Sequence, residues 1–347
     1  MQYLQELVKT VQHNCAISDA QYAGNYSMCT FLLKMREYYR WEQKIPLSGK
    51  IPRDDVGSWM VHREQSWEPL ENEAYSQLVI DNESFDPFDT QGINEKLLPH
   101  GYIYNSGRGI FSKPHFSLGK LLKHEVRENI SILISQFEYA RDLVAPPATF
   151  LNQTIFISRE SLKRFLWEKI EEWKWNKRTD VPMAQVIECY PHHGDMEALL
   201  NAFVDNETEN TILHEIGEAR AGKLLGDEWE QMLATLSCTK AEFKARAVRD
   251  HLADCISTLP ELIETQNQAS LHFYFSNMTG LRKLLFPQLI KGYQEWLSSG
   301  KLATLETVCK TGEEHWYQVA NNMLALFKQH NTNAVEPIEE YIAKIYL

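Results

Sequence analysis

Hydrophobic residues recur with helical spacing along most of the last two thirds of this 347-residue chain. From Leu118 to Ala140 they return every three or four positions, which predicts an amphipathic helix that ends before the next prolines. Alternation typical of strands is limited to two short segments. Further helices are predicted over residues 158–173, 195–225, 239–257, 261–285, 287–298, 302–329 and 336–346, and the two strands over 154–157 and 184–189. The pattern therefore predicts a mainly α protein.

The first third of the chain has a different pattern. Residues 1–44 are predicted to be helical, whereas from Pro46 to Pro114 prolines and glycines divide the chain into short pieces, with one helix near 67–80. Aromatic residues persist in this part, so we expect ordered loops and not disorder. We therefore divide the chain into a loop-rich N-terminal region, residues 1–117, and a helical domain, residues 118–347.

Composition narrows the class of partner. A formal net charge of -12 predicts a surface that repels nucleic-acid phosphates and anionic lipid, and no tract rich in lysine and arginine offsets it. The N-terminus lacks a signal-peptide pattern, and no run approaches the roughly 20 apolar residues that span a bilayer. The six cysteines form no Cys-x-x-Cys pair, so we expect reduced thiols. We expect a cytoplasmic protein without a nucleic-acid or membrane partner.

The residues that come closest to indicating a chemistry lie on one predicted helix. Seven residues of helix bring Glu207 and His214 to nearly the same side, and Glu218 follows one turn later. Gly217 and Ala221 lie near that side and would let a neighbouring helix approach closely. Helical bundles present metal ligands to their cores in this way, so we interpret the three polar residues as candidate metal ligands. A hydrated helix face is the alternative, because acidic residues surround Glu207.

The order of features over residues 195–328 resembles the haem-oxygenase-like superfamily. This all-α superfamily includes haem oxygenases, TenA thiaminases, the PQQ-synthesis oxidase and a group of non-haem di-iron oxygenases. In the di-iron group a glutamate is followed seven residues later by a histidine and then by an amphipathic helix that ends in a Leu-Gly turn. Glu207, His214 and Leu225-Gly226 match that order. The resemblance implies a haem-oxygenase-like helical bundle with a loop-rich N-terminal extension.

The later part of the resemblance concerns two further helices. The aromatic segment 269–277 is similar to the family's middle helix, and His315 occupies the position of a histidine that follows a pair of acids in the last helix. Other ligand positions of the family differ here. The middle-helix glutamate is replaced by Ser276 or Asn277, and two ligands of the last helix by Val308 and Gly312. His272, one turn before the missing glutamate, is a substitute candidate.

The surviving residues imply a site of two imidazoles and one carboxylate, the donor set that holds mononuclear Fe(II) with positions open for O2 and substrate. We expect Glu207, His214 and His315 to bind iron, with His272 or Glu218 nearby. The predicted function is an O2-dependent oxidation of a small molecule. Two alternatives stay open.

The first alternative is a metal-free enzyme on the same fold. The second is a non-catalytic helical protein that binds a partner through the aromatic-rich residues 58–116. The sequence identifies no catalytic residue and no substrate, and it leaves a homodimer open.

Overall fold

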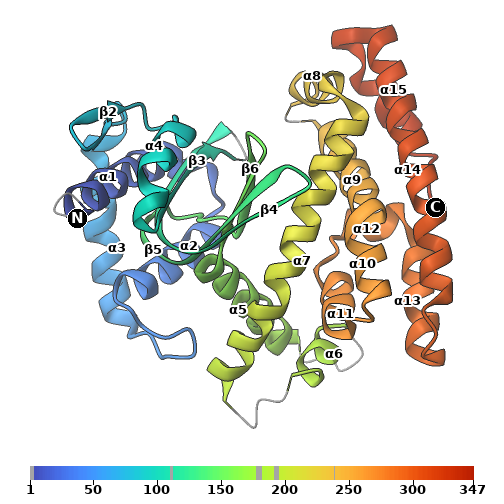
Figure 1. Ribbon diagram of the computed structural model, residues 1–347, viewed down its shortest axis with the longest axis horizontal. Coiled ribbons are helices and arrows are strands. Elements are labelled where there is room, and N and C mark those ends of the chain that lie inside the picture. Colours follow the sequence, from blue (N-terminus) through green and yellow to red (C-terminus); the bar gives the residue numbers. More distant parts are fainter. Residues whose placement is uncertain (1–3, 110–111, 177–181, 191–194, 238) are drawn as a thin grey trace. The chain divides into compact units, whose positions relative to one another are not determined.

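The computed structural model describes residues 4–109, 112–176, 182–190, 195–237 and 239–347. The chain divides into two compact units, each of which is described by itself (Figure 1). The N-terminal unit consists of residues 1–169 and 194–204, and the C-terminal unit of residues 170–193 and 205–347. Within the described ranges, no helix is both long and apolar enough to cross a bilayer.

A five-stranded sheet forms the centre of the N-terminal unit, with the strand order β3-β4-β5-β7-β6 (Figure 1). Neighbouring strands are antiparallel, except that β5 and β7 run parallel. The strands are β3 (Tyr102–Arg108), β4 (Pro114–Arg127), β5 (Ile130–Arg141), β6 (Ala148–Leu151) and β7 (Thr154–Ser158). A separate hairpin consists of β1 (Leu78–Ile80) and β2 (Glu83–Phe85).

Short turns with left-handed backbone produce these hairpins. Between β4 and β5, Glu128 and Asn129 have φ values of 53° and 66°, so the two-residue loop has the positive φ values of a type I′ turn. The loops Asp81-Asn82 and Asn152-Gln153 also have two positive φ values each. Such turns match the twist of paired strands. The helix predicted from Leu118 to Ala140 is therefore wrong, because this segment is the β4–β5 hairpin.

Helices of the N-terminal unit cover the sheet. Leu7, Val11 and Cys15 of α1 pack against Phe116 and Leu118, which alternate along β4 and face the same core. The helices are α1 (Leu4–Tyr22), α2 (Met28–Glu42), α3 (Arg53–Trp67), α4 (Thr90–Leu97) and α5 (Arg159–Asn176), whose last residues belong to the C-terminal unit. The helix predicted near 67–80 is wrong, because α3 ends at Trp67 and β1 occupies residues 78–80.

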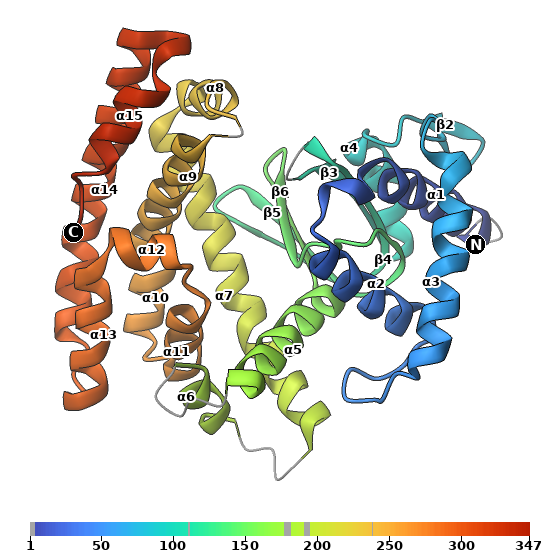
Figure 2. The ribbon, with the colours of Figure 1, turned by 180° about the vertical axis from the view of Figure 1, so that it is seen from behind.

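All the described regular elements of the C-terminal unit are helical (Figure 2). Its α-helices are α6 (Pro182–Glu188), α7 (Met196–Leu225), α8 (Asp227–Thr235), α9 (Lys240–Ala253), α10 (Leu259–Glu264), α11 (Gln268–Asn277), α12 (Gly280–Leu285), α13 (Pro287–Ser299), α14 (Ala303–His330) and α15 (Val335–Ile342). Residues 196–204 of α7 belong to the N-terminal unit. The predicted helices 195–225, 287–298 and 302–329 are confirmed as α7, α13 and α14. The strand predicted at 184–189 is wrong, because α6 occupies it.

Close approach of α7 to the end of α9 requires a glycine at position 217. A Cβ atom at Gly217 would lie 2.6 Å from the carbonyl oxygen of Ala253, so only glycine fits there. Immediately after α9 the chain forms a π-helical turn, Asp254–Thr258, in which the Ser257 hydroxyl donates to the Leu213 carbonyl at 2.8 Å. The expected close approach of a neighbouring helix is confirmed. π-Helical turns inside α-helices are frequent at functional sites.

The protein is thus mixed α/β, and the prediction of a mainly α, haem-oxygenase-like bundle is wrong. The helical part of the prediction describes the C-terminal unit. It fails for the N-terminal unit because residues 102–158 form a sheet whose strands were interpreted as a helix and loops. Residue 118, at which the predicted helical domain begins, lies within β4.

Candidate functional site

A narrow pocket lies on the sheet of the N-terminal unit. Its volume of about 20 Å³ leaves room for about one water molecule or a small chemical group. Apolar side chains, including those of Ile103 and Phe156, form part of its wall. The polar residues that line it include Asn105, His115, Ser117, Ser135, Glu138 and Asp142. The pocket is much smaller than most ligand sites, and it is the convergence of polar groups on it that makes it a candidate active site.

Strand register brings His115, on β4, close to Asp142, at the end of β5. His115 and Ser117 are two residues apart on β4, so their side chains point to the same face of the sheet. Ser117 pairs with Arg141 of β5, and Asp142 follows directly after that strand. The pairing of β4 with β5 shifts register near Gly119, which also lines the pocket. Irregularities of this kind are common next to active sites, where they redirect side chains.

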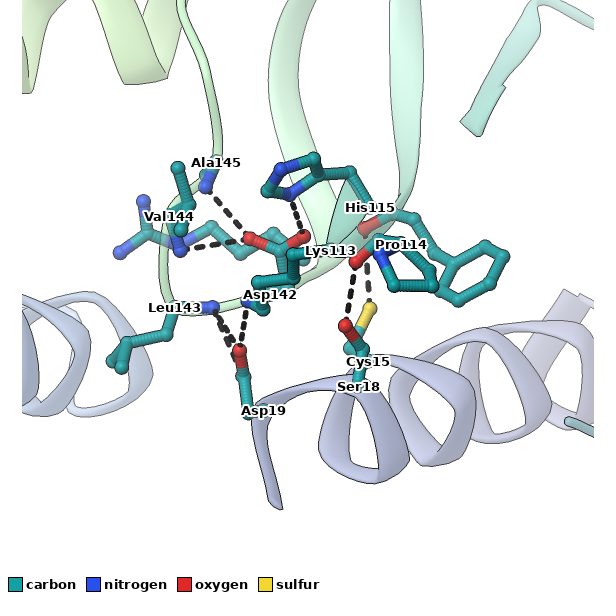
Figure 3. Close-up of polar contacts among 12 residues, drawn as sticks. Cys15, Ser18, Asp19, Lys113, Pro114, His115, Asp142, Leu143, Val144 and Ala145 are labelled. Carbon is teal, nitrogen blue, oxygen red and sulfur yellow. Dashed lines mark hydrogen bonds and ion pairs between the residues drawn. The ribbon is translucent and has the colours of Figure 1, made fainter. Parts of the chain in front are cut away.

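Asp142 is a buried carboxylate held in a fixed orientation (Figure 3). Its Oδ1 atom accepts hydrogen bonds from the backbone N–H groups of Val144 and Ala145, at 2.7 and 2.8 Å. Its Oδ2 atom lies 2.6 Å from Nδ1 of His115. Burial raises the pKa of Asp142, but Lys113 and His115 outweigh burial and hold that pKa well below its usual value. Because the carboxyl is ionised, Nδ1 of His115 carries the proton and donates a hydrogen bond to Asp142.

The second ring nitrogen of His115, Nε2, is the one that could bind another group. Within the described part of the chain, no hydrogen bond is formed to Nε2 of His115. The ring lies over Gly109, where a Cβ atom would come within 2.3 Å of Nε2. The His115 side chain is 12% exposed, whereas that of Asp142 is only 1% exposed. Nε2 is therefore a lone-pair nitrogen on a residue that lines the pocket.

A second buried carboxylate, that of Asp19, lies in the same group of charged residues as Asp142. Asp19, on α1, lies 2.6 Å from Nζ of Lys113 and accepts the backbone N–H of Leu143 at 2.9 Å (Figure 3). Burial raises the pKa of Asp19, Lys113 lowers it and Asp142 raises it again, to about 6. Burial lowers the pKa of Lys113, but the two carboxylates outweigh burial and raise it. Lys113 thus forms an ion pair with Asp19 and also acts electrostatically on Asp142.

Two further hydrogen bonds fasten α1 to the start of β4. The Ser18 hydroxyl donates to the Pro114 carbonyl at 2.5 Å, and the Cys15 thiol donates to the Phe116 carbonyl at 3.1 Å (Figure 3). These contacts fix the backbone on both sides of His115. The ring is therefore positioned by its neighbours in the chain and by Asp142, which is the preorganisation that a catalytic group requires.

The residues predicted from the sequence lie in the C-terminal unit, and Glu207 is the most deeply buried of them. Its carboxyl accepts hydrogen bonds from the Ser270 hydroxyl at 2.6 Å and from the amide groups of Asn210 and Asn206 at 2.7 and 3.2 Å. Burial raises the pKa of Glu207 to about 7, although these hydrogen bonds oppose the increase. Glu207 is thus part of a hydrogen-bond network of neutral side chains.

His214 and Glu218 belong to a different, charged network. Nδ1 of His214 lies 2.9 Å from Asp254, and Nε2 lies 3.4 Å from Glu218. Glu218 also pairs with Arg249 at 3.0 Å. Burial lowers the pKa of His214, but hydrogen bonds to Asp254 and Glu218 outweigh burial and raise that pKa well above 6.5. His214 is therefore an imidazolium between two carboxylates.

Asp254 is the centre of this network. Its buried carboxylate accepts from the Tyr274 hydroxyl at 3.0 Å, forms an ion pair with Arg282 and faces His214. Burial raises the pKa of Asp254, but Arg282 and His214 outweigh burial and lower it. Sequence analysis did not select Asp254 or Arg282 as site residues. Asp254 lies on the π-helical turn and Arg282 on α12, and neither belongs to a recognised sequence motif.

His272 and His315 have surroundings of their own. His272 is buried, lies 2.9 Å from the Tyr293 hydroxyl and stacks on Trp296 with ring centroids 4.7 Å apart. Burial lowers its pKa to about 4. His315, on α14, packs edge-on against Trp316 with centroids 4.7 Å apart, and burial lowers its pKa as well.

These positions do not make a metal centre. Among the described residues, no three or more His, Cys, Asp or Glu side chains are grouped so that they could hold a metal ion. The prediction of an iron-binding, all-α protein is corrected accordingly. The structure brings His214 and Glu218 together, while protein groups occupy the polar atoms of Glu207 and one ring nitrogen of His272.

The sequence could have indicated His115 and Asp142 only through the hairpin. The two residues are 27 positions apart and belong to no recognised motif. An interpretation of residues 114–141 as two strands joined at Glu128-Asn129 would have placed them at neighbouring strand ends. The helical interpretation separated them instead.

Comparison with known proteins identifies one family. Residues 6–158 match the N-terminal domain, and residues 163–345 the C-terminal domain, of a family of unknown function, DUF6866. No curated protein and no solved structure matches the chain. The assignment to the haem-oxygenase-like superfamily is therefore wrong. Nothing in these matches tests the predicted oxidation of a small molecule, which stays a prediction.

Proposed function

The chain belongs to the DUF6866 family, and we propose that its N-terminal domain carries out acid–base chemistry on a small molecule, with His115 as the proton acceptor. One observation carries this proposal. Nδ1 of His115 is bonded to Asp142 at 2.6 Å, while Nε2 has no hydrogen-bond partner within the described residues and the ring lines a pocket.

The pairing with Asp142 supplies what a general base needs. An ionised carboxylate at Nδ1 fixes the neutral imidazole in the tautomer whose lone pair is on Nε2. When Nε2 takes a proton, the ring becomes an imidazolium, and Asp142 stabilises the new positive charge. Positioned acid–base groups of this kind accelerate reactions by about 100-fold to 10,000-fold.

The pocket limits the group that reacts. Its volume of about 20 Å³ admits a water molecule or the small end of a substrate, while the rest of the substrate stays outside. Ser117 and Asn105 are paired across β4 and β3 and line the same pocket, so they offer hydrogen bonds that orient this group. We therefore expect the proton to be taken from a water molecule or from a hydroxyl group.

Incubation of the full-length protein with a metabolite extract, followed by mass spectrometry, tests the proposal. We expect at least one metabolite to be consumed, and the His115→Gln variant to consume it about 100-fold more slowly. His124→Gln is the matched control, because His124 lies on the same strand, is exposed and bonds to Ser131 at 3.0 Å. Unchanged turnover in His115→Gln, or no metabolite consumed by the wild type, would contradict the proposal.

A further inference from the structure

We propose that the buried thiols of Cys255 and Cys309, in the C-terminal unit, form a redox modification site at which a peroxide converts the pair into a disulfide. Cys255 lies on the π-helical turn and Cys309 on α14. The two residues are 54 positions apart in the sequence, so only the fold brings them together. Neither belongs to the pocket of His115, so this inference goes beyond the proposed acid–base function and does not rest on it.

The two cysteine side chains are in direct contact. The thiol of Cys309 donates a hydrogen bond to the carbonyl oxygen of Cys255 at 3.4 Å. The two thiols also hydrogen-bond to each other, which is the main reason that the pKa of Cys255 lies well above its usual value, and burial raises this pKa further. A disulfide forms without backbone movement only where two cysteines lie close and their side chains face each other. These contacts show that Cys255 and Cys309 already face each other as free thiols.

A glycine on α14 permits this close approach. Gly312 lies three residues after Cys309, so both are on the same face of the helix. A Cβ atom at Gly312 would come within 2.8 Å of Sγ of Cys255 and within 2.7 Å of the Phe286 ring. Any larger residue would therefore push Cys255 away from α14. The packing holds the two sulfur atoms together in the core, where Cys255 and Cys309 are only 2% and 3% exposed.

Burial favours a small oxidant, and hydrogen peroxide is little larger than water. One thiol sulfur attacks a peroxide oxygen, the O–O bond breaks, and the thiol proton leaves with the released hydroxide as water, so that a sulfenic acid forms. The second sulfur then attacks the sulfenic sulfur, and the sulfenic hydroxyl leaves with the second thiol proton as another water. Two electrons thus pass from the two sulfurs to the peroxide. Because the raised pKa keeps Cys255 protonated, we expect this reaction to be slow.

Mass spectrometry of the folded full-length protein after treatment with millimolar hydrogen peroxide tests this inference. The remaining thiols are alkylated, and the protein is digested with trypsin without a reductant. Cys255 is the only cysteine of the tryptic peptide 250–282, and Cys309 is the only cysteine of the peptide 302–310. We expect these two peptides to be joined, with a mass two hydrogen atoms below their sum. Dithiothreitol should separate them again.

Gly312→Ala tests the geometry that carries the inference. Its Cβ atom displaces Cys255 from α14, so we expect the yield of the cross-linked peptides to fall about tenfold. Gly222→Ala is the matched control, because Gly222 is also a helical glycine of the C-terminal unit, and a Cβ atom there would have no neighbour within 4 Å. It should give the cross-link in the same yield as the wild type.

A comparison with unfolded wild-type protein requires no variant. In urea the same treatment should distribute cross-links among the six cysteines, and the pair Cys255–Cys309 should lose its preference. The inference is overturned if the folded protein gives no such cross-link, if this cross-link takes the same share of all cross-links in urea, or if Gly312→Ala forms it as readily as Gly222→Ala. None of these results depends on turnover at His115, so this inference and the proposed function fail separately.

Discussion

The N-terminal and C-terminal units each contain a histidine whose Nδ1 atom faces a buried aspartate. Asp142 and His115 are 2.6 Å apart, and Asp254 and His214 are 2.9 Å apart. Both aspartate side chains are 1% exposed. The pairs differ at the other ring nitrogen, because Nε2 of His214 lies 3.4 Å from Glu218, whereas Nε2 of His115 forms no hydrogen bond within the described part of the chain.

This difference decides what each histidine can do. Hydrogen bonds to two carboxylates raise the pKa of His214 well above 6.5, so the ring already holds the proton that a general base would accept. Its positive charge pairs with Asp254, which also pairs with Arg282. His115 has one carboxylate partner and keeps a lone pair on a pocket-lining ring. A buried Asp–His pair therefore suits acid–base chemistry only when nothing acidic blocks its second nitrogen.

The largest effect should come from Asp254→Ala. The substitution removes the carboxylate that faces Arg282 and His214, and leaves both cations without their shared partner. Breaking a buried ion pair by removing one member costs about 3 to 5 kcal/mol, so we expect a loss of that size in the free energy of unfolding. Urea denaturation followed by circular dichroism measures it. Glu264→Ala, at an exposed position of α10, should change the same quantity by less than about 0.5 kcal/mol. Equal effects of the two substitutions would show that Asp254 does not stabilise the unit.

The pH dependence of stability should reveal the proton that His214 holds in the folded state. Because the folded-state pKa of His214 lies above its unfolded value near 6.5, the native state binds the extra proton between these two values. The stabilisation is complete below the unfolded pKa and is lost as pH rises through the folded pKa. A single proton changes the free energy of unfolding by at most about 1.4 kcal/mol per pH unit in this window. We expect a smaller slope, because the His214 side chain is 33% exposed and solvent screens its charge.

Urea denaturation of the wild type and His214→Gln from about pH 7 to about pH 8.5 measures this dependence. Burial also raises the pKa values of Glu207 and Glu215 to about 7, so the stability that these acids cost is lost mostly as pH rises towards 7 and stays lost above it, in the wild type and the variant alike. The difference between wild type and variant should shrink as pH rises. A constant difference would mean that His214 is not protonated in the folded state.

Sequence analysis predicted the helices of the C-terminal unit correctly where those helices are long. Helices such as α7 and α14 span 30 and 28 residues, and over such lengths helical periodicity differs clearly from alternation. It failed for residues 114–141 because Leu118, Leu122 and Val126 lie four residues apart, a spacing that also fits one face of a strand, on which every second residue points the same way. The turn at Glu128-Asn129 lacks glycine, so nothing prompted an interpretation as a hairpin.

The candidate site could not be predicted for a related reason. Glu207, His214 and Glu218 attracted attention because spacing along one helix brings side chains together locally. His115 and Asp142 meet only through strand pairing over 27 residues, and Asp254 meets His214 over 40. Contacts of this range depend on the fold, which periodicity alone does not supply. Even on α7, the periodicity did not distinguish the uncharged surroundings of Glu207 from the charged surroundings of His214.

The smallest expected effect comes from making the C-terminal pair resemble the N-terminal one. Glu218→Gln removes the carboxylate that lies 3.4 Å from Nε2 of His214, while Asp254 stays at Nδ1. We expect the pKa of His214 to fall, because one of the two carboxylates that raise it is lost. An NMR titration of the His214 ring, assigned through His214→Gln, measures this shift. The free energy of unfolding should change by no more than about 1 kcal/mol, since the Glu218 side chain is partly exposed.

Glu230→Gln controls for the second partner of Glu218. Arg249 pairs with both acids, at 3.0 Å from Glu218 and 3.5 Å from Glu230, whereas the acids that pair with His214 are Glu218 and Asp254. Its loss should therefore leave the pKa of His214 where it is in the wild type. If both substitutions lower this pKa equally, Arg249 and not the carboxylate at Nε2 governs the protonation of His214. The contrast with His115 would then rest on nearby arginines, because the second nitrogen would no longer explain it.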